Sequence, residues 1–276
     1  MKSFDRFVKT MNEQATVDKH NTITVVYGLT PQKDNDTLVL QNLWKGLPNV
    51  HVYYTYRDDP REIRVAAENE SNILIMCGHG SPGGLFGRRA DKFGATGFGY
   101  TIDGSVNFRA KYVIGMWCHA KDYAKQFHKT GFFTSMYISN LGEAKYELGR
   151  ERIAGVTNEM IWKSETDFCK LINGYIQTSL DKIEQWPEMV LRDMPPRNIV
   201  EKFNHEAVEY IYGDQDYDRP EELSISQVLE DFIYLNNDTD DLQVLRARFK
   251  KQHPDLAARQ SIVKELFGDK NSAIDV

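Results

Sequence analysis

Two side chains with reactive groups follow apolar runs that predict β-strands. The run NILIMC is followed by Gly78, His79 and Gly80, and the run KYVIGMW is followed by Cys118. Sites in open parallel sheets form beyond the carboxyl ends of the strands, and consecutive strands joined by crossovers are usually neighbours. We therefore expect His79 and Cys118 to meet at one edge of a sheet.

A cysteine beside a histidine suits acyl transfer. The thiolate is the nucleophile, and a nearby imidazole can accept the thiol proton and return it to the leaving group. A neighbouring imidazolium and a following helix N-terminus would both lower the apparent pKa of Cys118. The developing oxyanion needs backbone N–H donors, and the amides of Gly80 and Cys118 are the candidates.

Other interpretations of these residues stay open. A cysteine in a strand is often only a core residue, which is how we interpret Cys77. Cys77, His79, Cys118 and His119 are also of the types that bind zinc. However, adjacent residues of a strand point to opposite faces, which disfavours a site using both Cys118 and His119. We expect neither a metal nor a cofactor.

The elements that must position the dyad alternate along the first half of the chain. Apolar, β-branched runs at residues 23–29, 50–56, 72–77, 111–118 and 131–140 predict strands. Helical patterns lie between them, including one at 60–68 that opens with proline and one at 119–129. This alternation predicts an α/β fold with a doubly wound, mostly parallel sheet, carried by residues 1–150.

A glycine-rich insertion, residues 81–108, separates the third strand from the fourth. Gly94, Gly97 and Gly99 predict a mobile loop that covers the site, and Asp103–Gly104 suits a hairpin turn. A loop this long in a compact domain tends to be functional.

The remaining chain, residues 151–276, has a helical pattern and is expected to form a C-terminal layer or subdomain. Apolar stripes at helical spacing occupy 161–183, 200–211, 225–233 and 242–267, and Ser224 with Gln227 forms a capping box. The polar segment 213–222 is the best internal linker.

Composition excludes several classes of protein. The 34 basic and 40 acidic residues give a net charge of −6, which disfavours a nucleic-acid partner. No apolar run has the roughly 18 residues of a membrane span, and the opening MKSFDRFVKT lacks the apolar core of a secretory signal. Three cysteines argue against a disulfide framework. We therefore expect a cytoplasmic protein, of undetermined oligomeric state.

The two strand ends together resemble a known superfamily. ILIMCGHGSPGGLFG followed by KYVIGMWCHA resembles the caspase–clostripain–gingipain–separase superfamily of cysteine peptidases, over about residues 20–145. The resemblance is strongest to bacterial caspase-like domains that carry a His-Gly-Ser step. It implies a caspase-like sheet in which His79 is the general base and Cys118 the nucleophile. The amides of Gly80 and Cys118 would form the oxyanion hole.

The resemblance has two departures close to the nucleophile. Arginine-specific members place an aspartate two residues before the cysteine, where this chain has Met116, so their specificity does not transfer. A small residue commonly precedes the cysteine, where this chain has Trp117. We expect Ser81, Met116 and Glu143 to contribute to substrate binding, with Glu143 a candidate wall for a basic group or simply a helix N-terminal residue.

These observations favour a cysteine peptidase-like hydrolase that acts on a peptide or protein. The main alternative is a catalytically silent, caspase-like interaction or sensor domain whose helical C-terminal part binds a partner. A thiol hydrolase acting on a small amide is a third possibility. The sequence leaves the cleavage preference and any activation step open.

Overall fold

The computed structural model describes residues 22–28, 35–91 and 94–215, together with residues 244, 247, 248 and 251. The chain divides into two compact units, residues 1–218 and 219–276, and the boundary falls inside the polar segment predicted as a linker. The helical stripe expected at 225–233 lies outside the described residues, as does the one at 242–267 apart from the four single positions. The described strands all belong to the first unit.

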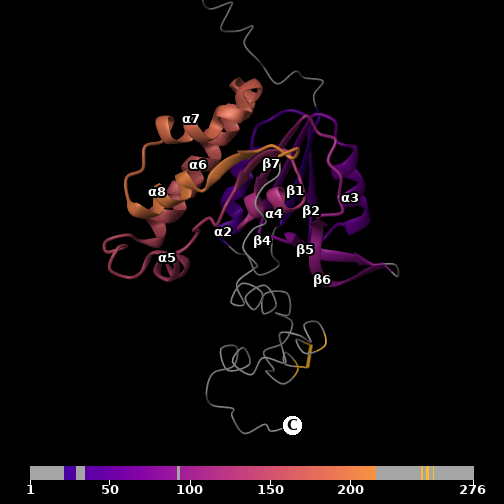
Figure 1. Ribbon diagram of the computed structural model, residues 1–276, viewed down its shortest axis with the longest axis horizontal. Coiled ribbons are helices and arrows are strands. Elements are labelled where there is room, and N and C mark those ends of the chain that lie inside the picture. Colours follow the sequence, from indigo (N-terminus) through magenta and orange to yellow (C-terminus); the bar gives the residue numbers. More distant parts are fainter. Residues whose placement is uncertain are drawn as a thin grey trace, which may run out of the picture. The chain divides into compact units, whose positions relative to one another are not determined.

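A six-stranded sheet with the order β2-β1-β3-β7-β8-β9 forms the centre of this unit (Figure 1). Its strands are β1 (Ile23–Gly28), β2 (Val50–Tyr54), β3 (Ile73–Gly78), β7 (Tyr112–Met116), β8 (Gly131–Thr134) and β9 (Val208–Ile211). All neighbouring pairs are parallel except β8 and β9, which are antiparallel. The fold is therefore α/β with a mostly parallel sheet, as the alternating pattern predicts.

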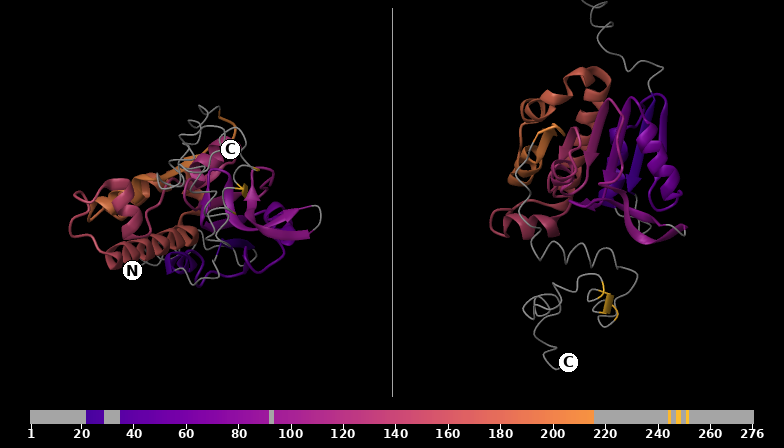
Figure 2. Two further views of the ribbon diagram at one scale, coloured as in Figure 1. Left: turned by 90° about the horizontal axis from the view of Figure 1, so that it is seen from below. Right: turned by 45° about the vertical axis from the view of Figure 1, so that its right-hand side comes forward.

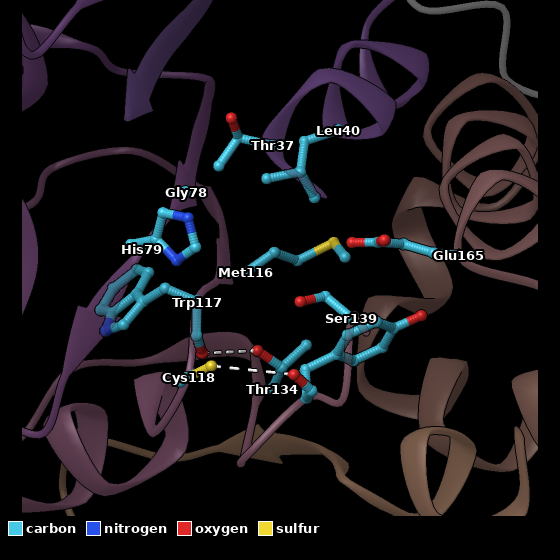
Figure 3. Close-up of a pocket in the computed structure, with 11 residues that line it drawn as sticks. Thr37, Leu40, Gly78, His79, Met116, Trp117, Cys118, Thr134, Ser139 and Glu165 are labelled. Carbon is cyan, nitrogen blue, oxygen red and sulfur yellow. Dashed lines mark hydrogen bonds between the residues drawn. The ribbon is translucent and has the colours of Figure 1, made fainter. Parts of the chain in front are cut away.

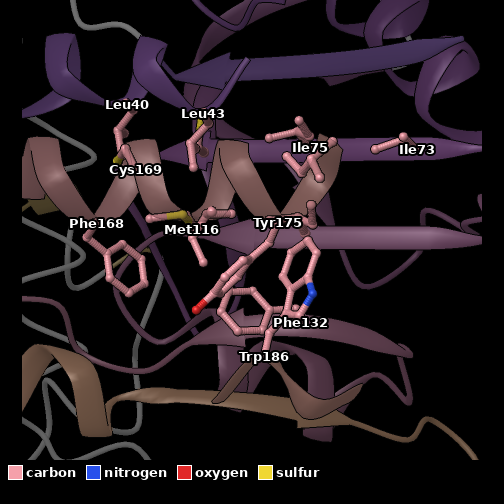
Figure 4. Packing of buried hydrophobic residues seen from close by; sticks show 14 of the residues in the cluster. Leu40, Leu43, Ile73, Ile75, Met116, Phe132, Phe168, Cys169, Tyr175 and Trp186 are labelled. Carbon is pink, nitrogen blue, oxygen red and sulfur yellow. The ribbon is translucent and has the colours of Figure 1, made fainter. Parts of the chain in front are cut away.

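Helices lie on both faces of the sheet, which explains the uninterrupted apolar strands. Every residue of β1 and β3 is buried. Alternate strand residues pack with Phe168 and Trp186 on one face, and with Ile63 and Tyr123 on the other. Figures 2 and 4 show the long helix of the first face lying along the strands. This two-sided arrangement is compatible with a doubly wound fold.

The helices have the following bounds. They are α2 (Asn35–Leu38), η1 (Val39–Leu43), α3 (Pro60–Asn69), α4 (Ala120–Gln126), α5 (Leu141–Leu148), α6 (Asn158–Thr178), η2 (Leu180–Gln185), α7 (Trp186–Asp193) and α8 (Ile199–Glu206), where η marks a 3₁₀ helix. Side-chain caps begin several of them, including Asp59 at α3, Thr157 at α6 and Asn198 at α8.

Residues after 150 belong to the same core as the strands. Phe168, Ile172 and Ile176 of α6 are fully buried in one cluster with the side chains of β1, β3 and β7. The helical stripe predicted at 200–211 is wrong at its end, because α8 stops at Glu206 and Val208–Ile211 is strand β9. The sequence VEYI has the alternation of a strand, and pairing with β8 satisfies its backbone.

The glycine-rich insertion forms strands in place of the loop that its glycines predict. β4 (Gly80–Ser81), β5 (Gly84–Asp91) and β6 (Gly94–Asp103) form a separate three-stranded antiparallel sheet. Asp103 and Gly104 do not form the turn of this hairpin. Asp103 instead ends β6, where its carboxylate accepts a 2.6 Å hydrogen bond from Arg64 of α3.

No helix in the described part of the chain is both long enough and apolar enough to cross a membrane.

The paired ends of β1 and β3 generate a prediction about stability. Gly78 has a φ of +143°, and a Cβ there would lie 2.7 Å from the Cα of Gly28. Gly78→Ala should therefore lower the free energy of unfolding by about 3 kcal/mol, from backbone strain and collision with a neighbouring backbone. Urea denaturation measures this loss.

Gly174→Ala is the matched control, because a Cβ at this position of α6 meets nothing within 4 Å. Alanine in a helix should stabilise the protein by about 0.5–1 kcal/mol relative to glycine. Equal effects of the two substitutions would contradict the close approach of β1 and β3.

Candidate functional site

A pocket lies beyond the carboxyl ends of β3, β7 and β8 (Figure 3), and it contains both predicted reactive residues. Its walls are formed by Thr37, Leu40, Gly78, His79, Met116, Trp117, Cys118, Thr134, Tyr137, Ser139 and Glu165. Its cavity measures about 40 Å³, room for about three water molecules. This position is the edge where open parallel sheets bind ligands.

The register of the sheet brings His79 and Cys118 to the same level. Cys77 of β3 pairs with Met116 of β7. His79 follows Cys77 by two residues, and Cys118 follows Met116 by two residues. Both reactive residues are half-buried and line the pocket. The thiol of Cys118 donates a 3.7 Å hydrogen bond to the carbonyl oxygen of Tyr137. His79 and Cys118 therefore line one pocket at the edge of the sheet, and the hydrogen bond of the thiol goes to Tyr137.

Backbone contacts on both sides hold Cys118 in place. The carbonyl of Trp117 accepts hydrogen bonds from the Thr134 hydroxyl at 2.9 Å and from the Ala120 amide at 3.1 Å. His119 has a left-handed backbone conformation with φ +65°, and its imidazole is 2.9 Å from the Asp122 carboxylate. The turn between β7 and α4 thus directs Cys118 into the pocket and leaves His119 paired on α4.

Gly80, the expected amide donor, lies in the short strand β4 and is not among the residues that line the pocket. In the ladder between β4 and β5, Gly80 pairs with Leu85 and Ser81 with Gly84. On the other side of Gly80, the amide of Phe86 donates a 2.9 Å hydrogen bond to the carbonyl of His79. Bonding alternates along an antiparallel ladder, so the N–H of Gly80 points away from β5. The position also has to be glycine, because a Cβ would lie 2.2 Å from Cδ1 of Trp117.

The three residues expected to bind substrate have different environments. Met116 lines the pocket, and Figure 3 shows its side chain extending across the cavity. Ser81 is buried, with its hydroxyl 2.8 Å from that of Tyr100, and does not belong to the lining set. Glu143 is in the first turn of α5 and accepts hydrogen bonds at 2.7 and 3.0 Å from the amide and hydroxyl of Ser139. Glu143 therefore orients Ser139, which lines the pocket, and does not line the pocket itself.

Glu165 is an acidic pocket residue that the sequence analysis did not single out. It belongs to α6, is 3% exposed and lines the pocket. A sequence signal was present: Glu165 falls on the buried stripe that includes Ile161, Phe168 and Ile172. A carboxylate on the apolar face of a helix is costly unless it has a polar environment, so the stripe marks Glu165 as unusual.

The site disfavours a thiolate, which is opposite to the lowered pKa expected from a His–Cys pair. Burial, together with the negative charges of Glu143, Glu165 and Glu147, raises the pKa of Cys118 to about 12, against a smaller lowering by its hydrogen bond to Tyr137. The following helix α4 has only seven residues, Ala120–Gln126, and is shorter than predicted. Cys118 is therefore a neutral thiol near pH 7.

The residues discussed as zinc ligands are separated by their packing. Cys77 is fully buried in the hydrophobic core, as predicted, and His119 is paired with Asp122. Across the described ranges, no group of three or more His, Cys, Asp or Glu side chains is arranged to hold a metal ion.

The electrostatics of the pocket generate a second prediction. Glu143→Gln should lower the pKa of Cys118, because the substitution removes the largest of the three carboxylate contributions and keeps an oxygen that accepts from Ser139. The pH profile of Cys118 alkylation should move to lower pH, with about a fivefold faster reaction at a fixed pH below the pKa. Peptide mapping after timed alkylation measures the rate at Cys118 alone.

Glu188→Gln is the control, since Glu188 also lies in the first turn of a helix, α7, and is not among the groups that raise the pKa of Cys118. An unchanged Cys118 profile in Glu143→Gln would show that the charge of Glu143 does not raise the thiol pKa.

Comparison of the chain with models of protein families, with curated proteins and with solved structures finds no match in any of the three. The chemistry of the site therefore follows from its own residues and their geometry.

Proposed function

We propose that this protein is a cysteine peptidase-like hydrolase on a caspase-like sheet, with Cys118 as the nucleophile and His79 as the general base. One observation carries the proposal: two parallel strands in register end in a histidine and a cysteine that line one pocket. The motif resemblance in the sequence, the His-Gly step and the strand-end cysteine, points the same way. A peptide or protein substrate, no nucleic-acid or membrane partner and a cytoplasmic location are parts of this proposal.

In the proposed reaction, the sulfur of Cys118 attacks the scissile carbonyl carbon as His79 accepts the thiol proton. The amides of Gly80 and Cys118 donate hydrogen bonds to the oxyanion of the tetrahedral intermediate. His79 then gives its proton to the leaving amine, and a thioester to Cys118 remains. Water, deprotonated by His79, hydrolyses the thioester and restores the thiol.

The raised pKa of Cys118 determines when the proton moves in this scheme. The thiol is neutral before substrate binds, and the thiolate is the nucleophile. In this scheme the proton therefore moves to His79 during the attack on the carbonyl carbon.

A mutational test addresses the dyad directly. The test uses three proteins: wild type, Cys118→Ala and His79→Ala. Each is incubated with a proteome-derived peptide library and with a panel of small amides. Mass spectrometry detects new peptide termini and released amines. Wild type should cleave, Cys118→Ala should abolish cleavage, and His79→Ala should slow it by about 100-fold or more. Cys118→Ala should keep its free energy of unfolding within about 2 kcal/mol of wild type.

His51→Ala provides the matched control, because His51 is an exposed histidine of β2 outside the pocket. It should cleave at the wild-type rate. Full cleavage by Cys118→Ala would end the proposal.

The second candidate is a catalytically silent domain that keeps the fold and binds a partner. The raised pKa of Cys118 favours it, because a neutral thiol is a poor nucleophile. It predicts no cleavage by the wild type and no mass increase at Cys118 when activated acyl esters are supplied. The hydrolase instead forms a thioester at Cys118 that disappears with time.

A further inference from the structure

Trp117, the residue directly before Cys118, contacts the His79–Gly80–Ser81 segment at two points. Its indole Nε1–H donates a 3.1 Å hydrogen bond to the carbonyl of Ser81. Its Cδ1 occupies the space where a side chain at position 80 would start, 2.2 Å from an ideal Cβ. Trp117 is 2% exposed. One side chain therefore spans the gap between the end of β7 and the end of β3.

The indole is held tightly on its other sides. It packs edge-on against Tyr123, with ring centroids 5.3 Å apart, and against Phe133 at 6.3 Å. A Cβ on Gly115 would lie 2.9 Å from Cζ3 of the indole, so this side is also closed. Close packing of this kind allows the ring a single orientation.

Both segments that the indole connects are themselves anchored. The hydroxyl of Ser81 is 2.8 Å from that of Tyr100 on β6 and accepts a 3.1 Å hydrogen bond from the amide of Gly83. The carbonyl of Trp117 is held by Thr134 at the end of β8. The indole therefore joins two segments that are otherwise anchored to different strands.

We propose that Trp117 is a positioning residue that sets the distance and angle between the Gly80 amide and Cys118. This inference rests on the proposed function, in which those two groups act on one carbonyl. Oxyanion donors must lie within a few tenths of an ångström of their productive position, and a misplacement of 1 Å costs about 100-fold in rate. The Nε1–H of Trp117 is already bonded to Ser81, so in this proposal Trp117 acts through Gly80 and Cys118.

The pairing of Trp117 with Gly80 also accounts for the departure from the family motif. The superfamily that the sequence resembles commonly has a small residue before the cysteine. Here the indole fills the space over a glycine that has no Cβ, so the large and the small residue are complementary. A small residue at position 117 with Gly80 unchanged would leave a void between the strand ends.

The test compares Trp117→Phe with Trp186→Phe. Trp186 is also fully buried, and its Nε1–H donates a 3.0 Å hydrogen bond to the carbonyl of a serine, Ser179. The two substitutions remove the same kind of bond from the same fold. Both should therefore lower the urea midpoint by similar amounts, and only Trp117→Phe should change the site.

Two site measurements separate a positioning role from a structural one. On the peptide cleaved fastest by the wild type, Trp117→Phe should lower kcat about tenfold and leave KM within about twofold, because ground-state binding does not use the oxyanion donors. Amide hydrogen exchange in the segment 79–83 should become faster in Trp117→Phe and remain at the wild-type rate in Trp186→Phe.

The outcomes distinguish this inference from the proposed function. Unchanged kcat and unchanged exchange in Trp117→Phe would overturn the positioning role, whether or not the wild type cleaves peptides. If the wild type cleaves nothing, the proposed function fails. Faster exchange limited to Trp117→Phe would then still support Trp117 as the residue that holds the segment. A loss of kcat equal to that of Trp186→Phe would show a general effect of destabilisation and contradict the inference.

Discussion

The parallel pairing of β3 with β7 is the interaction on which the site depends. Cys77 faces Met116 across this pair, so the backbone leaves the sheet at the same level on both strands. Two residues later, one strand presents His79 and the other presents Cys118. A slip of one residue would exchange the faces of every side chain on one strand and separate the two groups. Alternate residues of β3 pack in two different core clusters, and this specific packing opposes such a slip.

The layer of helices that covers this sheet also determines the electrostatics of the pocket. Helix α6 packs along the strands through Phe168 and Ile172, and the same face places Glu165 in the pocket wall. Glu143 approaches from α5 and orients Ser139. Carboxylates in the low-dielectric edge of a core favour the neutral thiol, which links the packing of the C-terminal helices to the reactivity of Cys118. The site is thus built by residues from both halves of the described chain.

Trp117 connects the segments that follow β3 and β7 through one large side chain. Its indole fills the space over Gly80, donates to Ser81 and packs against Tyr123. The β4–β5–β6 sheet reaches the same point through the contact of Ser81 with Tyr100. The insertion between β3 and β7 is therefore connected to the segment before Cys118 through contacts of Tyr100, Ser81 and Trp117.

The sequence by itself determined the strands of the parallel sheet and the two residues at their ends. Runs such as ITVVYG and ILIMCG are apolar without interruption, and this local property indicates a strand buried on both faces. Strand-end positions for His79 and Cys118 follow from those runs, as does the core position of Cys77. The tertiary structure alone decided the rest, because each of these features depends on which distant segments pack together. Val208–Ile211 is a strand because β8 offers it a partner, and the glycine-rich insertion is a sheet because its strands pair with each other. The acidic surroundings that raise the pKa of Cys118 come from helices that follow it in the chain, and they are brought to the thiol only by the packing of α5 and α6 on the sheet.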